Sequence, residues 1–508
     1  MVQLGFCTIL SATYSGMDVD IINVEADIRM GLPMFLMVGY LSSEVKEAAD
    51  RVRTAINNTC DEFPIKNVTV NLSPVSIRKR GAAFDLPVAI SILAADGRFT
   101  LKDSEHTLFV GELGLNGNIR KVKGILPIVL KAKETGIKRC FVPKENEKEG
   151  SLVEGIQVVG VENLKDVVLM LQGKKKIVPG KSDVFVEDDK IAADVDFKDI
   201  YGQENVKRAA IISVAGGHNI LMQGPPGSGK SLIAKAMAGI LPPMDMDEIF
   251  EVTKVYSIAG MLSEKMPYVN KRPFRSVTHT ATKSALYGGG VIPVPGEISL
   301  AHKGILFLDE LPEFRKEVIE VLREPLEENK VLISRNHKSY EYPACIILVV
   351  ATNPCPCGYY PDLNKCKCKQ NEIDKYKSKI SGPIMDRIDL YVEAKKVDYE
   401  TLKGKTSAKS SKEIREEVKR VRNIQSERYK NEEFKVNGRI PGMLVDKYCG
   451  LDKKSEELMK NIYDSFNITA RSYHKILKVA RTIADIDGEE NININHLMEA
   501  VAYRTGDV

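Results

Sequence analysis

The sequence predicts a multi-domain α/β protein whose core, built on a parallel sheet, lies between a mixed α+β first block and a helical last block. A glycine-rich phosphate-binding motif lies between an apolar strand and a helical run, which is the context that such a motif requires. Strand and helix patterns alternate from about Phe197 to about Glu393, as they do in α/β layers. Helical periodicity follows, and Ile414, Val418 and Val421 share one helix face.

Length and composition describe a globular protein with several cores. The chain has 508 residues, of which 43% are hydrophobic and 28% charged, so about two to four domains are expected. The net charge of +4 neither requires nor excludes a nucleic-acid partner. No apolar run approaches the roughly 20 residues of a membrane span, and the first residues lack a secretion signal. Nine cysteines, an odd number, then suggest reduced thiols and a cytoplasmic protein without a membrane partner.

The first domain is expected at residues 1–172, followed by a linker at 173–196. Alternation predicts strands in VDIINVEADI and NVTVNLS, and helical spacing predicts a helix in SSEVKEAADRVRTAINN. The linker begins with GKKKIVPGKSDVFVEDDK, which has several breakers and no apolar period.

The phosphate-binding motif lies in NILMQGPPGSGKSLIAKAMAG, directly after the predicted strand Ile220–Met222. Its backbone N–H groups can close around phosphate oxygens, and the start of the following helix adds positive potential. Lys230 would reach the β- and γ-phosphates of ATP, and the Ser231 hydroxyl would ligate Mg²⁺. The predicted nucleotide-binding residues are Gly224, Pro225, Pro226, Gly227, Ser228, Gly229, Lys230 and Ser231.

Two further strands end in polar residues. GILFLDE contains a buried strand, Ile305–Leu308, followed by Asp309, which can hold the Mg²⁺ shell, and Glu310, which can polarise the attacking water. An acidic pair after a strand is often only a cap, but the phosphate-binding motif upstream favours the catalytic interpretation. The strand IILVVATN ends in Asn353, which we expect to help orient that water rather than only to cap the strand.

Arg387 lies in SGPIMDRIDLYVEA, beside a predicted sheet edge. Phosphoryl transfer builds negative charge on the γ-phosphate, which an arginine from a neighbouring subunit can stabilise. From the residues alone, an ordinary surface ion pair is the simpler role for this side chain.

Four of the nine cysteines lie in NPCPCGYYPDLNKCKC, as the pairs Cys355/Cys357 and Cys366/Cys368. Four thiolates so close in sequence favour tetrahedral Zn²⁺, which would close a loop too short for a core of its own. The C-x-C spacing is tighter than the usual C-x(2–4)-C, so an iron–sulfur cluster and free thiols stay open as alternatives.

Taken together, these motifs resemble the AAA+ ATPases of the magnesium-chelatase group, and the whole chain resembles the ComM/YifB family. The stretches that carry this resemblance are VNLSPVSIRKRGAAFDLPVAISILAA, GGGVIPVPGEISLAHKGILFLDELPEF and SGPIMDRIDL. The family implies an ATPase core at 197–395 with a cysteine insertion at 355–368, and a helical lid of the magnesium-chelatase C-terminal type at 396–508. It also implies a homo-hexamer that binds branched or single-stranded DNA and uses ATP and Mg²⁺ to drive branch migration or unwinding of branched DNA. This activity would be independent of sequence and would serve natural transformation and recombination.

In such a ring the active sites lie at subunit junctions. The resemblance therefore makes Arg387 an arginine finger that acts in trans. It also makes Arg471, in TARSYHKILKVAR, a second sensor in the lid, with Arg481 as the competing choice.

The family also carries two insertions that line the pore of the ring. Here they correspond to a glycine-rich segment around ALYGGGVIPVPGE and to a hairpin in VLISRNHKSYEYPACIILVV. Arg335, His337 and Lys338 lie near the turn of the hairpin, where they could grip a phosphate backbone or be ordinary solvated turn residues.

The first domain resembles the Lon-protease domain, above all in FVGELGLNGNIRKVKGILPIVLKAKETGIKRCFVPKEN. Lon chemistry needs a serine nucleophile that a lysine amine activates. Ala83 takes the serine position and Leu126 the lysine position, and neither side chain can do that chemistry. Ser76, Lys79 and Lys123 lie nearby, but no pattern gives them a shared site. We expect a Lon-like fold without proteolysis, used for ring assembly or, through its basic RKRG turn, for nucleic-acid contact.

Two stretches are richer in basic residues than the rest of the chain. Residues 403–430 hold ten lysines and arginines against four acidic residues, and a second basic run, 365–379, surrounds the cysteines. Neither is rich in aromatic residues, which favours contact with a phosphate backbone over base stacking. A solvated lid helix explains the first run equally well.

Three alternatives to a DNA motor stay open. The motor subunit of a metal chelatase would share the ATPase core, but such motors lack the Lon-like domain and the cysteine cluster. An ATP-dependent protease is disfavoured by Ala83 and Leu126. A remodelling ATPase that does not move along strands would keep every nucleotide-binding motif.

Overall fold

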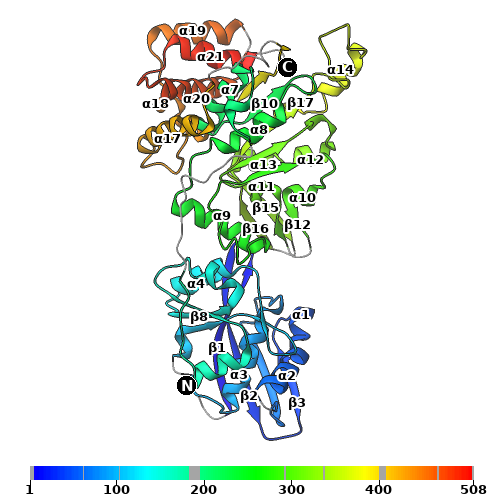
Figure 1. Cartoon of the computed structure of the whole chain (residues 1–508), viewed down its shortest axis with the longest axis vertical. Helices are drawn as coiled ribbons and strands as arrows, with labels where there is room; N and C mark the ends of the chain where they lie inside the picture. Colours follow the sequence, from blue (N-terminus) through cyan, green and yellow to red (C-terminus); the bar gives the residue numbers. More distant parts are fainter. Residues whose placement is uncertain are drawn as a thin grey trace. The chain divides into compact units, whose positions relative to one another are not determined.

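The structure is a computed structural model that describes residues 5–60, 62–101, 103–181, 195–290, 293–335, 338–399, 408–465 and 468–505. The chain forms two compact units (Figure 1). Unit 1 comprises residues 1–185 and 249–269, and unit 2 comprises residues 186–248 and 270–508. Most of the predicted linker, His337, and Lys403 and Lys405 of the first basic run lie outside the described residues.

Unit 1 is built on a mixed seven-stranded sheet with the strand order β3-β4-β2-β1-β5-β8-β9. The pairs β1/β2 and β2/β4 are antiparallel, and the other neighbours are parallel. These strands are β1 (Phe6–Ser15), β2 (Asp18–Arg29), β3 (Met34–Val38), β4 (Asn67–Ser73), β5 (Thr107–Phe109), β8 (Arg139–Pro143) and β9 (Gln157–Val161). A small hairpin adds β6 (Glu112–Leu113) and β7 (Ile119–Arg120).

Alternation along the strands of unit 1 directs apolar side chains into two cores, one on each face of the sheet. In β1, Ile9 belongs to the first core and Ala12 to the second, and in β5 Phe109 and Leu108 divide in the same way. Its helices are α1 (Ser43–Lys46), α2 (Ala48–Thr59), α3 (Asp85–Ala95), α4 (Ile125–Glu134), α5 (Glu147–Gly150), α6 (Leu164–Leu171) and most of α9 (Met246–Ala259). Helices α2, α3 and α6 cover the first core, and α4 covers the second.

A segment from later in the chain completes unit 1, and we call residues 249–269 the insert segment. Its Phe250 and Tyr268 pack against the second core. Its Ser257 donates a hydrogen bond to the buried carboxylate of Glu149. These residues fall within the predicted ATPase core at 197–395, but they belong to unit 1 instead, because their apolar side chains are buried there.

Unit 2 is built on a five-stranded sheet in which all neighbouring strands are parallel, with the order β11-β14-β17-β10-β18. The strands are β10 (Ile220–Gln223), β11 (Phe274–Val277), β14 (Ile305–Leu308), β17 (Ile347–Thr352) and β18 (Leu390–Glu393). Every residue of β14 and β17 is buried, as in a sheet that helices cover on both faces. The predicted parallel sheet and its predicted strands are confirmed.

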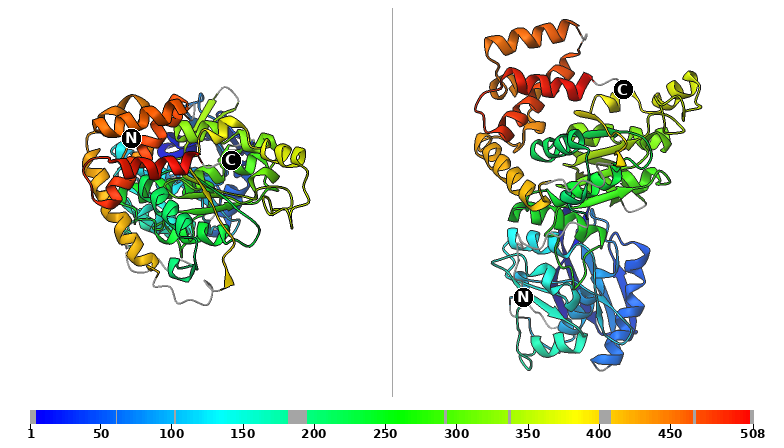
Figure 2. Two further views of the ribbon diagram at one scale, coloured as in Figure 1. Left: turned by 90° about the horizontal axis from the view of Figure 1, so that it is seen from above. Right: turned by 45° about the horizontal axis from the view of Figure 1, so that its top comes forward.

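Helices flank this sheet and form the end of the chain. They are α7 (Glu204–Gly216), α8 (Lys230–Gly239), α17 (Ser411–Arg428), α18 (Val445–Tyr448), α19 (Lys453–Ser465), α20 (Ala470–Asp487) and α21 (Ile494–Thr505). The last five gather into the predicted helical lid, drawn in orange and red in Figures 1 and 2. Ile414, Val418 and Val421 on α17 share one core with the sheet, which confirms the predicted helix face.

Two antiparallel hairpins interrupt the alternation of strands and helices, at the places of the two predicted insertions. One pairs β12 (Gly288–Gly289) with β13 (Val294–Pro295), and the other pairs β15 (Lys330–Arg335) with β16 (Lys338–Pro343). The remaining helices are α10 (Lys283–Tyr287), α11 (Glu297–Leu300), α12 (Lys316–Glu320), α13 (Arg323–Glu328), α14 (Gln370–Lys377) and α15 (Gly382–Met385). Among the described residues, no helix combines the length and the apolar character that crossing a membrane requires.

Candidate active site

The carboxyl ends of three neighbouring strands bring the predicted catalytic residues to one edge of the unit 2 sheet. Strand β17 lies between β14 and β10, so Asn353 lies between Asp309 and the loop that follows β10. Because the strands are parallel, their ends meet at the same edge, where α/β proteins bind their ligands.

The phosphate-binding loop makes a tight connection between β10 and α8. Gly227 and Gly229 have φ angles of 76° and 89°, in the left-handed region that favours glycine. A Cβ atom at Gly224 would lie 2.2 Å from the carbonyl oxygen of Ala394, so only glycine lets the loop pass this close. The loop and the start of α8 present backbone N–H groups, which fits the phosphates of a nucleotide.

Lys230 is buried, and its ammonium group lies inside this loop. Its Nζ donates to the carbonyl oxygen of Gly224 at 2.7 Å and lies 3.4 Å from Oδ1 of Asn353. Burial lowers the pKa of Lys230, and the carboxylates of Asp309 and Glu310 oppose that shift. The predicted phosphate-binding lysine and the polar end of β17 therefore share one site.

Ser231 and Asp309, the two predicted Mg²⁺ ligands, are in direct contact. The Ser231 hydroxyl donates to Oδ2 of Asp309 at 2.9 Å. Mg²⁺ prefers oxygen ligands of this kind, so the donor set fits the ion. Glu310 is exposed beside them and has a φ angle of 53°, which is uncommon outside glycine. Backbone strain of this kind gathers at active sites.

Gln203 is a candidate that the sequence analysis missed. It also has a left-handed backbone, with a φ angle of 59°. Its side-chain amide donates to the carbonyl oxygen of Ser228 at 3.0 Å and to that of Lys395, which ties the phosphate-binding loop to the segment after β18. These partners lie 25 and 192 positions away, so no local pattern indicates the role.

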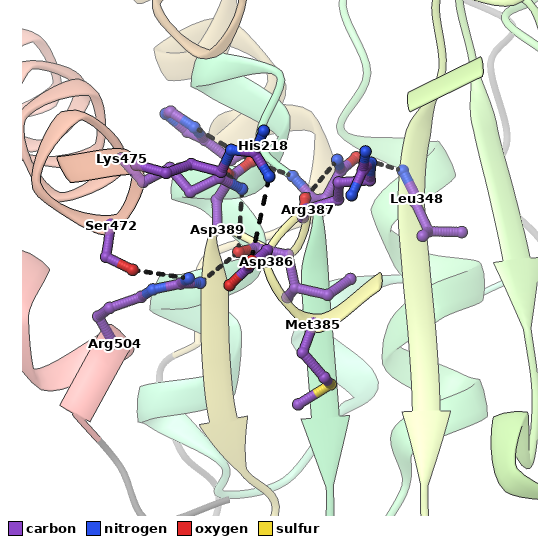
Figure 3. A network of polar contacts seen from close by, with 12 residues as sticks. His218, Leu348, Met385, Asp386, Arg387, Asp389, Ser472, Lys475 and Arg504 are labelled. Atoms are coloured by element: carbon purple, nitrogen blue, oxygen red, sulfur yellow. Dashed lines mark hydrogen bonds and ion pairs between the residues drawn. The ribbon is translucent and has the colours of Figure 1, made fainter. Parts of the chain in front are cut away.

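Arg387 lies at the opposite edge of the sheet from the phosphate-binding loop. It precedes β18, whose first residue, Leu390, pairs with Ile220, the first residue of β10. The loop instead follows the last residue of β10, and four residues of strand span about 13 Å. Figure 3 shows Arg387 beside the starts of the strands, whose arrowheads point away from it. Arg387 is therefore placed away from the nucleotide site of its own chain.

Arg387 and Arg471 share one carboxylate. Nη2 of Arg387 lies 2.6 Å from Oε1 of Glu327, and Nη2 of Arg471 lies 3.3 Å from the same atom. The Arg387 side chain is only 9% exposed and also donates to the carbonyl oxygens of Arg323 and Pro383. The Arg471 side chain is 56% exposed. The two arginines that were predicted to act at a subunit junction thus lie side by side.

Arg481, the alternative to Arg471, has a structural role. It is buried, pairs with Asp485 at 3.1 Å, and donates to the carbonyl oxygens of Glu489 and Glu490 just after α20 ends. A guanidinium group with these acceptors inside its own unit is poorly placed to meet a nucleotide. The geometry therefore favours Arg471 as the sensor.

A buried polar network holds the Arg387 segment against the lid (Figure 3). Lys475 of α20 lies 2.6 Å from Oδ1 of Asp389. Burial alone would raise the pKa of Asp389. The charge of Lys475 opposes burial and helps to lower this pKa to about 2. Burial lowers the pKa of His218 to about 4, so this ring is neutral at pH 7, and its Nε2 lies 2.8 Å from the Thr482 hydroxyl.

The four cysteines of the insertion form one cluster, the only group of three or more potential metal ligands found in the described part of the chain. The Sγ atoms of Cys355, Cys357 and Cys366 are 3.4 to 3.8 Å apart, and with that of Cys368 all lie within 4.8 Å. Sulfurs about 2.3 Å from a tetrahedral Zn²⁺ would be about 3.8 Å apart. Disulfide sulfurs would be only about 2.05 Å apart. The spacing fits the ion.

The cysteine cluster packs beside the phosphate-binding loop. A Cβ atom at Gly358, between the two cysteine pairs, would lie 2.5 Å from Cδ of Pro226. A backbone hydrogen bond from Tyr359, together with the neighbouring thiols, lowers the pKa of Cys357 to about 6. The cluster can therefore supply a thiolate near neutral pH and can brace the nucleotide site.

The two basic runs differ in the structure. On α17, Arg415 is buried, Arg422 donates to the carbonyl oxygen of Val214, and Arg428 pairs with Asp485 at 2.6 Å. These arginines are engaged inside unit 2, which favours the lid-helix explanation of this run. Around the cysteines the exposed lysines are Lys365, Lys367, Lys369, Lys375 and Lys379.

Leu126, at the position of the missing lysine, lies in the apolar interior of unit 1, and Ala83, at the position of the missing serine, is partly buried beside it. Leu126 is fully buried in the second core, and Ala83 packs against that core. Lys79 is buried and donates to a backbone carbonyl, whereas Ser76 and Lys123 are exposed. Within the described ranges no hydrogen bond joins Ser76 to either lysine, so these substitutes form no dyad.

Three family models match the chain in sequence order. The model described as subunit ChlI of Mg-chelatase matches residues 24–146, and the one described as magnesium chelatase, subunit ChlI, matches residues 196–402. The model of the ChlI C-terminal region matches residues 408–504. The matches thus extend over the first domain, the nucleotide site and the lid.

The chain is similar to the competence protein ComM of Haemophilus influenzae, with 38% identity over 511 residues, which cover 99% of this chain and 98% of ComM. It is similar to YifB of Escherichia coli, with 38% identity over 493 residues and coverage of 97% and 96%. A shorter match links it to the DNA repair protein RadA of Listeria monocytogenes, with 40% identity over 87 residues, 17% of this chain and 18% of RadA.

Proposed function

The chain belongs to the ComM/YifB family of magnesium-chelatase-like proteins and is an ATPase of the AAA+ type, and we propose that it is a hexameric motor that moves branched DNA. The observation that carries this proposal is the carboxyl edge of the unit 2 sheet. There the phosphate-binding loop, Glu310, Asn353 and the Ser231–Asp309 contact come together. Similarity to a competence protein and to a DNA repair protein supports DNA as the substrate.

In the proposed reaction, backbone N–H groups of the loop bind the ATP phosphates. Lys230 exchanges its carbonyl acceptor for oxygens of the β- and γ-phosphates. Mg²⁺, which Ser231 and Asp309 would hold, supplies charge neutralisation of those phosphates. Glu310 polarises the attacking water, and Asn353 orients it.

The negative charge that develops on the γ-phosphate calls for a further cation beside Lys230 and Mg²⁺. Arg387 lies at the other edge of the sheet, so it would serve the site of a neighbouring subunit, with Arg471 beside it. A ring of head-to-tail contacts satisfies every site in this way, because each subunit gives its arginines to the next. This supports the hexamer that the family implies.

The DNA contacts are proposed for the two hairpins and the lysines around the cysteine cluster. Arg335 of β15 lies opposite Lys338 of β16 at the described end of the hairpin, and both residues are exposed. Such cations would bind phosphates without reading bases. The arginines of α17 are not part of this proposal.

A labelled four-way junction incubated with Mg-ATP tests the proposed function. We expect strand separation by the wild type and none by Lys230→Ala. Lys235→Ala, which removes an exposed lysine from the same helix α8, is the matched control and should behave as the wild type. Equal separation by the wild type and Lys230→Ala would refute the translocase. ATP hydrolysis without strand movement would instead identify a remodelling ATPase, the principal alternative.

We also propose that the cysteine cluster holds one structural Zn²⁺ that braces the nucleotide site. Metal analysis of the purified chain should find about one zinc per chain, since four thiolates complete a closed tetrahedral site. Cys366→Ser should lose most of it, whereas Cys345→Ser, a cysteine outside the cluster, should keep it. Less than half an equivalent in the wild type would contradict the proposal, and iron in its place would favour a cluster.

A chelatase motor is the alternative from a different class. The ChlI family models support this alternative. The relatives that match this chain over nearly its full length, the first unit included, do not support it. For unit 1 we propose a Lon-like fold without proteolysis, because Ala83 and Leu126 line an apolar interior. Degradation of casein by the wild type, lost on Ser76→Ala, would overturn that part.

A further inference from the structure

We propose that Glu327 is a positioning residue that links Arg387 and Arg471 to the two hairpins of unit 2. The inference rests on the proposed function, because it takes these arginines to face the nucleotide of a neighbouring subunit. It adds a step that the proposed function leaves open: how ATP bound by one subunit changes the hairpins of the next.

The first part of the link is the salt bridge of α13. Glu327 lies on this short helix, and its Oε1 is 2.6 Å from Arg387 and 3.3 Å from Arg471. Arg387 binds the same helix a second time, because its Nε donates to the carbonyl oxygen of Arg323 at 3.1 Å. Leu326 of the same helix is buried. The position of Arg387 and the position of α13 are therefore tied to each other.

The second part of the link runs from α13 to both hairpins through Tyr287. The Tyr287 hydroxyl lies 2.7 Å from Oε2 of Glu324, 3.1 Å from the carbonyl oxygen of Leu332 and 3.3 Å from its nitrogen. Leu332 belongs to β15, and Tyr287 directly precedes β12. Burial and the bond to Glu324 raise the pKa of Tyr287 to about 12, so its hydroxyl stays protonated.

Two more features make the hairpins follow α13. Only Asn329 separates the end of α13 from the start of β15, and its φ angle of 54° fixes a sharp turn there. The buried Tyr342 of β16 donates to the carbonyl oxygen of Pro293 at 2.8 Å, which joins the second hairpin to the segment before β13. A shift of α13 would therefore reach both hairpins.

ATP at a subunit junction would compete with Glu327 for the arginines. A γ-phosphate offers more negative charge and more acceptor oxygens than one carboxylate, so it would draw Arg387 and Arg471 away from Glu327. Loss of that ion pair would free α13, and the hairpins would move with it. The simpler explanation is an ion pair that only stabilises the fold, and an experiment has to separate the two.

Hydrogen exchange of the assembled full chain, measured by mass spectrometry with and without Mg²⁺ and a non-hydrolysable ATP analogue, separates them. Peptides from β15 and β16 report on the hairpin, and peptides from β10 report nucleotide binding. In the wild type we expect the analogue to change the exchange of both. In Glu327→Gln the hairpin response should be lost while the β10 response remains. Glu328→Gln, the exposed neighbour on α13, should respond as the wild type.

Tyr287→Phe provides a second test that leaves the arginines and their carboxylate untouched, and it decides the case if Glu327→Gln does not fold. It should also lose the hairpin response. A normal hairpin response in either folded variant, or no hairpin response in the wild type, overturns the inference. If the hairpins of the wild type respond but the wild type separates no DNA strands, the DNA function alone is overturned. No response at β10 would overturn both.

Discussion

At the scale of single residues, His218 shows how the lid is joined to the sheet. Its ring is completely buried, it pairs with Thr482, and the carboxylate of Asp389 lies 3.9 Å from its other nitrogen. The Lys475 ammonium already neutralises that carboxylate at 2.6 Å. Lys475, Lys478 and Arg422 all disfavour a further positive charge on the ring, so the network is built for a neutral histidine.

Acidification should therefore destabilise unit 2 through the protonation of His218. The pKa of His218 is about 4 in the fold and 6.5 when exposed, so the unfolded chain binds an extra proton between these values and stability falls as the pH falls from 6.5 to 4. The loss is on the order of 3 kcal/mol. Asp389, whose pKa is lowered from 3.8 to about 2, extends the loss below pH 3.8.

Urea midpoints from circular dichroism between pH 7.5 and pH 5 measure this effect. The wild type should lose stability across that range, and His218→Gln should show a flatter dependence. His106→Gln, which removes an exposed histidine of unit 1, should keep the wild-type slope. Equal slopes for His218→Gln and the wild type would show that this ring does not set the acid sensitivity.

The residues of the site differ in how far the sequence could predict them. Lys230, Ser231 and Asp309 were predictable because each lies in a short motif with its own strand beside it. Glu327 was not, since its partners Arg387 and Arg471 are 60 and 144 positions away and a glutamate on an exposed helix is ordinary. Contacts of this kind come from packing, which local patterns do not encode.

At the scale of elements, the β15–β16 hairpin is the clearest candidate for gripping DNA. Its strands pair over six residues each, from Lys330 and Pro343 to Arg335 and Lys338. The end nearest the turn is basic, whereas at the base Lys330 is paired with Glu341 at 3.1 Å. Among the described residues of this hairpin, the cations nearest the turn, Arg335 and Lys338, are therefore the ones presented for a phosphate backbone.

The double variant Arg335→Ser/Lys338→Ser should bind DNA more weakly, with a smaller dependence on salt. Each lost phosphate contact lowers the slope of log affinity against log salt by about 1. Fluorescence anisotropy of labelled single-stranded DNA at several salt concentrations measures both quantities. Lys330→Ser, at the base of the same hairpin, should change neither. An unchanged salt slope in the double variant would move the DNA contact elsewhere.

The elements themselves were largely predictable, with one instructive exception. The strands of unit 2 are short apolar runs that end in polar residues, and the lid helices have a regular apolar face. The hydrophobic period and the residues that end each run therefore indicate the same elements. The insert segment also has helical spacing, and that is all the sequence reveals. Its membership of unit 1 depends on Phe250 and Tyr268 packing against a core whose strands all lie in the first 161 residues of the chain.

At the scale of the whole molecule, the separation of Lys230 from Arg387 makes a prediction about mixed rings. Lys230→Ala and Arg387→Ala should each lack ATPase activity alone. Mixed in equal amounts, they should recover activity at roughly a quarter of the junctions, where an intact loop meets an intact arginine.

Steady-state ATP hydrolysis after mixing and reassembly measures this recovery. Lys230→Ala mixed with Glu310→Gln is the control and should stay inactive, because both residues belong to the same side of the junction. Activity of the first mixture no higher than the average of its components would show that Arg387 does not act in trans.

The insert segment also sets the order in which the chain can fold during synthesis. When residues 1–185 have emerged from the ribosome, Glu149 is still without its Ser257 partner, and the second core of unit 1 lacks Phe250 and Tyr268. Ribosome-bound chains halted before residue 249 should therefore be more sensitive to protease in unit 1 than chains halted well past residue 269. By that point the phosphate-binding loop has been made, but β14, β17 and β18 have not. The first unit to begin folding must therefore wait for a segment of its own that is made only after the second unit has begun to emerge.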